Sequence, residues 1–96
     1  MKDQFLEHLL SIIKSKKDEN PKVSYTAMLQ QEDIIETLKK IEEEAFEVIE
    51  AAKLKNKNDI IHEIADLWFH CLVLLAKKDI TVAEITAELQ KRQGVS

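Results

Sequence analysis

The sequence predicts an all-α protein, a bundle of about four to five helices that either pack very well or are completed by homo-oligomerisation. Its 96 residues include one glycine and one proline, the residues that turns and strand boundaries usually require. Apolar residues recur at intervals of three and four over long stretches, which is the spacing of one face of an α-helix. A chain of this length predicts a single domain, residues 1–96, with a core that is small for a monomer.

The first half of the chain predicts two long helices separated by a polar segment. We expect the first helix over about residues 3–16, where apolar residues have helical spacing. Residues 17–24 are polar, contain Pro21 and predict a loop, and residues 24–30 predict a short helical turn. The second long helix is expected over about residues 33–54, because its apolar residues form the seam typical of a helix bundle.

The second half predicts two more helices. Residues 55–58 form a short polar connection, so the helices on either side of it should be antiparallel neighbours. The next helix is expected over residues 59–77, and apolar residues on most of its circumference indicate a buried helix. The last helix should begin at Thr81, with Glu84 completing a capping box, and end before Gly94.

Charge and composition narrow the classes of function. The formal net charge of −4 argues against a nucleic-acid partner. The single cysteine, Cys71, cannot form an internal disulfide, which agrees with the cytoplasmic location that we expect. The longest purely apolar stretch, residues 71–76, is too short to span a bilayer, so we expect no membrane partner. The sequence has neither a glycine-rich phosphate loop nor a nucleophile elbow.

A narrow polar stripe runs along the apolar helix predicted over residues 59–77. At about 100° per residue, one side of this helix carries Glu63, Asp66 and the two histidines of this segment, His62 and His70. A carboxylate in apolar surroundings is costly unless something compensates its charge, and two carboxylates one turn apart also repel each other. Within this helix no lysine or arginine occurs before Lys77, so another helix or a bound cation must compensate the charge.

The preceding helix contributes further carboxylates. Glu44 borders its apolar seam and Glu47 follows at i+3, a spacing that points two side chains at one spot. Across a short antiparallel connection, this pair can face Glu63 and Asp66. Four converging carboxylates predict a site for Mg²⁺, with Mn²⁺ as the alternative, because zinc would require cysteine or histidine ligands at suitable spacing. Such ions would neutralise phosphate charge and activate a water, which predicts phosphate chemistry.

Structural roles for these residues are the alternative. A run of glutamates on a helix is usually a solvated face, and nearby lysines could pair with Glu63 and Asp66. These lysines are Lys39, Lys40 and Lys53. For His62 and His70 we favour a hydrogen-bonded structural role over metal ligation. A non-catalytic helical interaction module, whose acidic stripe pairs with a basic partner, therefore stays open.

The acidic residues resemble the pattern of a known superfamily. Residues 43–47 (EEAFE) and, after fifteen residues, 63–66 (EIAD) match the EExxE…ExxD pattern of the all-α NTP pyrophosphatases, also called MazG-like. More narrowly, the chain resembles the phosphoribosyl-ATP pyrophosphohydrolase family of histidine biosynthesis. The segments that carry this narrower resemblance are residues 24–26 (SYT), 37–41 (TLKKI), 51–53 (AAK) and 65–75 (ADLWFHCLVLL).

The resemblance implies hydrolysis of phosphoribosyl-ATP to phosphoribosyl-AMP and pyrophosphate, with Mg²⁺, by a homodimer whose helices form a shared bundle. The metal ligands that it implies are Glu44, Glu47, Glu63 and Asp66, with Glu43 as a nearby carboxylate that ligates the metal or orients water. Weaker candidates for contact with phosphate or ribose are Ser24, Tyr25, Thr26, Lys40 and Lys53. A MazG-like pyrophosphatase that acts on other nucleoside triphosphates is the alternative within the superfamily.

Overall fold

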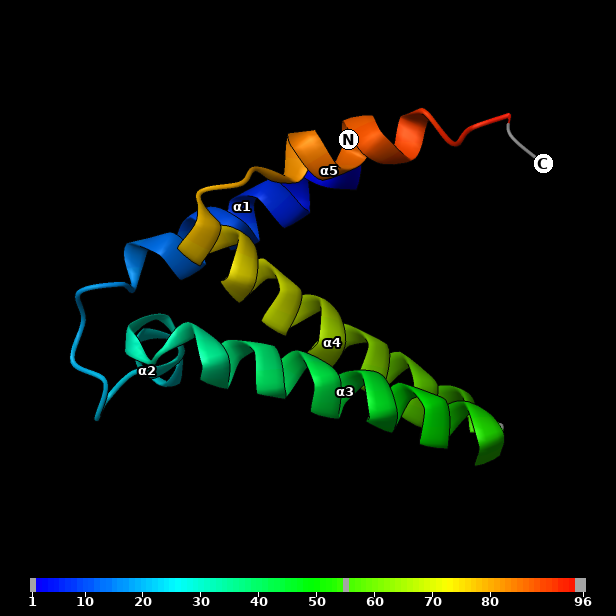
Figure 1. Ribbon diagram of the computed structural model, residues 1–96, viewed down its shortest axis with the longest axis horizontal. Coiled ribbons are helices and arrows are strands. Elements are labelled where there is room, and N and C mark those ends of the chain that lie inside the picture. Colours follow the sequence, from blue (N-terminus) through cyan, green and yellow to red (C-terminus); the bar gives the residue numbers. More distant parts are fainter. Residues whose placement is uncertain (1, 55, 95–96) are drawn as a thin grey trace.

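A computed structural model of the protein describes residues 2–54 and 56–94, which form five α-helices (Figure 1). The helices are α1 (Lys2–Ser15), α2 (Tyr25–Gln31), α3 (Ile34–Leu54), α4 (Lys57–Lys78) and α5 (Val82–Gln90). These two ranges contain no strand, so the all-α prediction is confirmed. None of the described helices combines the length and the apolar character that crossing a bilayer requires.

Local capping explains where two of the helices begin. The Oγ of Ser24 accepts a 3.0 Å hydrogen bond from the backbone N–H of Ala27 and so caps α2. The predicted capping box is present at the start of α5. The backbone N–H of Glu84 donates to Thr81 Oγ1 at 3.1 Å, and the N–H of Thr81 donates to Glu84 Oε1 at 2.8 Å.

Helix α4 begins earlier than predicted. Asn56 caps it, because its Oδ1 accepts a 3.2 Å hydrogen bond from the backbone N–H of Asp59, and the helix starts at Lys57. The predicted connection over residues 55–58 is therefore shorter, and its first residue, Lys55, lies outside the described residues. Helix α4 ends at Lys78, and Asp79, whose backbone is left-handed (φ 56°), is its C-terminal cap.

The helices form two parts that diverge from the end of the molecule where α2 lies (Figure 1). Helices α3 and α4 run side by side as an antiparallel hairpin, whereas α1 and α2 pack against α4, and α5 lies along α1 (Figure 1). The buried core lies where α1, α2, α4 and the start of α5 meet. Its residues are Leu10, Ile13, Leu29, Leu72, Val73 and Val82.

The other half of the hairpin extends beyond this core and leaves large apolar side chains exposed. Along α3 and α4 as a whole, the large apolar side chains that are more than half exposed are Ile35 at the start of α3 and, farther along the hairpin, Phe46, Ile49, Leu54, Ile61 and Trp68. The radius of gyration is 14.7 Å, compared with about 12.5 Å for a compact chain of this length. The expectation that α4 is buried all round is therefore wrong for the single chain, because Ile61 and Trp68 are not covered.

A lysine ties the end of α4 to the start of α3. Lys77 Nζ donates a hydrogen bond to the carbonyl oxygen of Glu32 and another to Thr37 Oγ1, both at 2.6 Å. The Thr37 side chain is buried, and burial lowers the pKa of the Lys77 ammonium. Two hydrogen bonds compensate this ammonium for its loss of water.

Candidate active site

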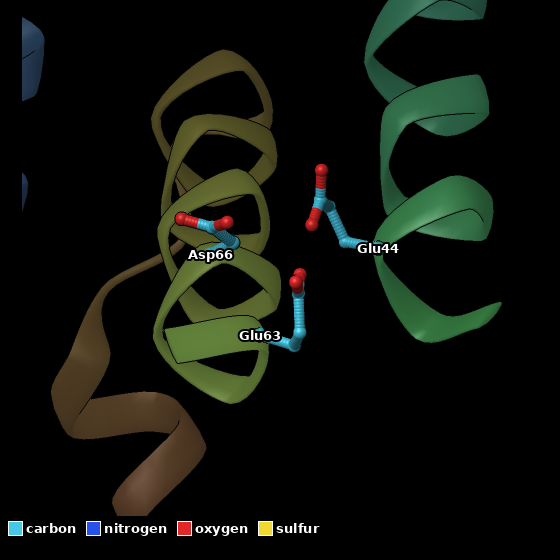
Figure 2. Close-up of side chains that lie close together, drawn as sticks. All are labelled: Glu44, Glu63 and Asp66. Carbon is cyan, nitrogen blue, oxygen red and sulfur yellow. The ribbon is translucent and has the colours of Figure 1, made fainter. Parts of the chain in front are cut away.

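Three carboxylates meet between α3 and α4 (Figure 2). Glu44 points from α3 towards Glu63 and Asp66 on α4, and one oxygen of each lies within 4.8 Å of the others. Glu63 and Asp66 share a face because residues at i and i+3 are neighbours on a helix. The antiparallel pairing of the two helices brings Glu44 level with them. We call these three residues the carboxylate cluster.

The carboxylate cluster carries more negative charge than its surroundings compensate. Burial raises the pKa of the Glu44 carboxyl above its ordinary value of 4.5, and the charges of Asp66, Glu63 and Glu47 raise it further. The Oε1 atom of Glu44 is buried and accepts no hydrogen bond from the residues that the structure describes. A buried carboxylate oxygen in this state is stabilised by a proton or by a cation.

The neighbouring lysines do not compensate this charge. Their ion pairs are Lys39–Glu36 at 3.5 Å, Lys40–Glu32 at 4.0 Å and Lys53–Glu50 at 3.4 Å. The basic side chain that does reach the carboxylate cluster is His62, whose Nε2 lies 3.3 Å from Asp66 Oδ2, one turn away on the same helix. Ion pairs with these lysines therefore do not compensate the charge of Glu63 and Asp66.

Two predicted site residues, Glu43 and Glu47, lie outside the carboxylate cluster. Both side chains are exposed on α3. Glu47 is close enough for its charge to raise the pKa of Glu44, but its oxygens do not join the group whose members lie within 4.8 Å of one another. Metal ligation by Glu47, and ligation or water orientation by Glu43, stay predictions.

The five predicted substrate-contacting residues are spread over the molecule. The Ser24 hydroxyl is occupied in capping α2, while Thr26 is half-buried and Tyr25 exposed on that helix. Lys40 lies one helical turn before Glu44, next to the carboxylate cluster. Lys53 is exposed near the tip of the hairpin and pairs with Glu50. Contact of these residues with phosphate or ribose stays a prediction.

The structure draws attention to His70, for which the sequence indicated a hydrogen-bonded structural role. The residue is only 7% exposed, yet its Nδ1 has no hydrogen-bond partner within the protein. Burial lowers the pKa of its imidazole, as does the charge of Lys40, although acidic neighbours including Asp66 act in the opposite direction. Its place on the polar stripe, one turn after Asp66, is the sequence signal that marks it.

Comparison with known proteins assigns the chain to a family. The family model described as Phosphoribosyl-ATP pyrophosphohydrolase matches residues 6–93. The chain belongs to this family. A phosphoribosyl-ATP pyrophosphatase of Leptospira biflexa is 48% identical over 91 residues, covering 95% of this chain and 99% of the relative. One of Nitrosomonas eutropha is 46% identical over 91 residues, covering 95% and 78%.

Membership in the phosphoribosyl-ATP pyrophosphohydrolase family confirms the resemblance drawn from the acidic pattern and its flanking segments. It also confirms the predicted class of enzyme, a hydrolase that acts on a pyrophosphate bond. The matched residues 6–93 include all three members of the carboxylate cluster and the helices that position them.

Proposed function

We propose that this protein hydrolyses phosphoribosyl-ATP to phosphoribosyl-AMP and pyrophosphate in histidine biosynthesis, and that it does so in the cytoplasm. The observation that carries the proposal is the carboxylate cluster, in which Glu44, Glu63 and Asp66 converge without a lysine or arginine partner among the described ion pairs. Such a cluster, in a chain of this family, supports metal-dependent cleavage of a phosphoanhydride.

The donor set of the carboxylate cluster fits a divalent cation. Its three converging oxygens are hard ligands of the kind that Mg²⁺ and Mn²⁺ prefer, and the buried Glu44 Oε1 lacks any other partner. We infer that Glu44, Glu63 and Asp66 would hold Mg²⁺, with Glu47 as a further ligand from the exposed side of α3. When bound, Mg²⁺ would supply charge neutralisation for the phosphates and an activated water.

The side chains around the carboxylate cluster support attack by water. The three members of the carboxylate cluster are all carboxylates, which suit a hydrolytic site as metal ligands or bases. The one cysteine of the chain, Cys71, is half-buried, and burial raises the pKa of its thiol, which makes it a poor nucleophile. We therefore propose that water attacks a phosphorus atom of the anhydride between the α- and β-phosphoryl groups. The anhydride bond breaks and pyrophosphate is released, without a covalent intermediate on the enzyme. His62 would hold the Asp66 carboxylate in place through their 3.3 Å contact.

We further propose that the enzyme is a homodimer in which each copy covers the exposed apolar side chains of the other. Phe46, Ile49, Ile61 and Trp68 lie on the same two helices as the carboxylate cluster and are each more than half exposed. Burial of such side chains stabilises an association of the kind that small domains need. Light scattering should give the mass of two chains, and Ile61→Asp should shift it towards one; a wild-type monomer at micromolar concentration would refute the dimer.

Substrate preference tests the proposed reaction. Release of pyrophosphate from phosphoribosyl-ATP should exceed that from a panel of nucleoside triphosphates by at least about tenfold in kcat/KM. Chelation of divalent ions should abolish it, and Mg²⁺ or Mn²⁺ should restore it. Equal or faster turnover of ordinary nucleoside triphosphates would favour a MazG-like pyrophosphatase instead.

Glu47→Gln tests the proposed fourth ligand, because this residue lies beside the carboxylate cluster and not in it. If Glu47 joins the metal when substrate binds, its loss should lower turnover about as strongly as Asp66→Asn does. Glu42→Gln, an exposed glutamate on the same helix, is the matched control and should leave turnover unchanged. Wild-type turnover in Glu47→Gln would remove this residue from the ligand set.

A further inference from the structure

Buried polar atoms without a hydrogen-bond partner in the protein occur in few places. Within the described part of the chain, such side-chain atoms belong to Gln30, Glu32, Glu44 and His70. Glu44 is part of the carboxylate cluster, Gln30 and Glu32 lie at the end of α2, and His70 lies on α4. Because an unpaired buried polar atom lowers stability, a group of them marks a place that a water, an ion or a polar ligand can fill.

Three polar residues, His70, Lys40 and Glu32, lie at the same height along the hairpin of α3 and α4. His70 follows Asp66 by one helical turn and Lys40 precedes Glu44 by one turn, so in the antiparallel hairpin both lie one turn from the carboxylate cluster, on the side of α2. Lys40 Nζ is 4.0 Å from Glu32 Oε1, which places the end of α2 at the same level. We call His70, Lys40 and Glu32 the polar layer.

The chemistry of the polar layer selects among the parts of a nucleotide. Lys40 Nζ, 4.0 Å away, balances the charge of Glu32, but the ionised Glu32 Oε1 can only accept hydrogen bonds, and an ionised phosphate has none to donate. The buried His70 imidazole, whose pKa is lowered by burial and then by Lys40, is neutral and can donate or accept at Nδ1. A sugar hydroxyl both donates and accepts, so it satisfies both atoms, whereas a phosphate satisfies only one.

We propose that the polar layer binds the hydroxyl groups of a ribose of the nucleotide substrate, with His70 Nδ1 and the Glu32 carboxylate as the contacting groups. The inference rests on the proposed function, because it places the phosphates at the carboxylate cluster and the adjoining sugar one helical turn away, about 5.4 Å along the hairpin. A nucleotide has a similar separation between its 5′-phosphate and its ribose hydroxyls. His70 and Glu32 would then recognise the substrate without taking part in bond cleavage.

Variants at His70 test the contact. His70→Leu removes both ring nitrogens, and His70→Asn keeps an amide group close to the position of Nδ1. We expect His70→Leu to raise KM for phosphoribosyl-ATP about tenfold with little change in kcat, and His70→Asn to recover most of the loss. The melting temperature of His70→Leu should not fall, since the substitution removes an unpaired buried atom. His8→Leu, an exposed histidine on α1, is the control.

Direct binding separates this inference from the proposed reaction. Calorimetry with Mg²⁺ should show that the wild type binds AMP about tenfold more tightly than 2′-deoxy-AMP or 3′-deoxy-AMP, and that His70→Leu and Glu32→Gln lose this preference. Glu32→Gln leaves the contact with Lys77 intact, because Lys77 donates to the backbone carbonyl oxygen of Glu32 and not to its side chain. The control for Glu32→Gln is Glu36→Gln, which removes an exposed glutamate near the start of α3.

Two results would overturn the ribose contact: unchanged KM and AMP preference in His70→Leu, or a lowered melting temperature with losses that His70→Asn does not recover. If the wild type distinguishes AMP from its deoxy forms through His70 but does not cleave phosphoribosyl-ATP, only the proposed reaction is refuted. If it cleaves phosphoribosyl-ATP without distinguishing the hydroxyls, only the ribose contact is refuted.

Discussion

The end of the molecule where α1, α2, α4 and the start of α5 form the core differs from the hairpin end in how its side chains find partners. At the first end, Leu10, Leu29 and Val73 pack against one another, and the ammonium of Lys77 makes two hydrogen bonds within the protein. At the hairpin end, Glu44 Oε1 has no partner and Trp68 is 56% exposed. The apolar core is thus completed within the chain, whereas the hairpin leaves a buried carboxylate oxygen and a large apolar side chain without such contacts.

The largest expected effect concerns activity at the hairpin end. Glu44→Gln keeps the size of the side chain but removes its charge, so turnover should fall about 1,000-fold, roughly 4 kcal/mol of transition-state stabilisation. The metal-free variant should melt at the same or a higher temperature, because burial and like charges disfavour the Glu44 carboxylate. Pyrophosphate release and thermal unfolding measure the two effects. Turnover within tenfold of wild type would contradict the role of Glu44, and Glu36→Gln is the control.

The next largest effect concerns stability at the core end. Leu29 is 1% exposed, and Leu29→Ala should lower the free energy of unfolding by roughly 2–5 kcal/mol, since it removes buried apolar contacts and leaves a cavity. Urea unfolding measures the change. Leu89→Ala, at a position that is 59% exposed on α5, is the matched control and should cost less than about 1 kcal/mol. Equal losses in the two variants would show that the core is not where the structure places it.

Addition of Mg²⁺ should raise the free energy of unfolding through the carboxylate cluster of the hairpin, whatever the state of the core. A cation that binds only the folded protein raises the free energy of unfolding by about 2.7 kcal/mol at a concentration one hundred times its Kd. This gain should persist in Leu29→Ala, which leaves the carboxylate cluster intact, and disappear in Glu44→Gln and Asp66→Asn. The measurement is thermal unfolding with and without Mg²⁺. A gain that survives both acidic substitutions would place the cation elsewhere.

The smallest expected effect is a pH dependence that arises from Glu44. Its pKa is raised in the folded protein, so folding favours the protonated carboxyl, and this contribution to stability is present below pH 4.5 and lost as pH rises through the folded pKa. Other carboxyl groups titrate over the same range, so Glu44→Gln is the reference. Without metal, any excess in the variant's melting temperature over the wild type should shrink as the pH falls from neutral towards 4.5. An excess that grows would contradict the direction of the shift.

Much of the fold follows from local signals in the sequence. Hydrophobic periodicity predicts the helices, and the hydroxyl of Thr81 predicts where α5 begins, because capping involves residues only three apart. The start of α4 was misplaced by two residues because Asn56 also has a capping side chain, which the predicted connection did not use.

The candidate site was predictable to the extent that it depends on helical spacing. Two i, i+3 pairs and a short connection predicted that carboxylates of α3 and α4 would face each other, and Glu44, Glu63 and Asp66 do so. A helical wheel gives the direction of a side chain but not the distance between two helices, so it could not show that Glu47 lies outside the carboxylate cluster. The unpaired Nδ1 of His70 depends on which atoms of other helices surround it, and spacing within α4 does not contain that information.

The contact of Lys77 with the start of α3 has a consequence for the two carboxylates of the cluster that lie eleven and fourteen residues earlier on α4. Sliding of α4 along α3 by one turn, about 5.4 Å, would break both 2.6 Å hydrogen bonds and leave a half-buried ammonium without acceptors. The alignment that brings Asp66 opposite Glu44 is therefore fixed by a lysine at the far end of the helix. We therefore expect substitution of Lys77 to shift Asp66 relative to Glu44 without removing either of these proposed metal ligands.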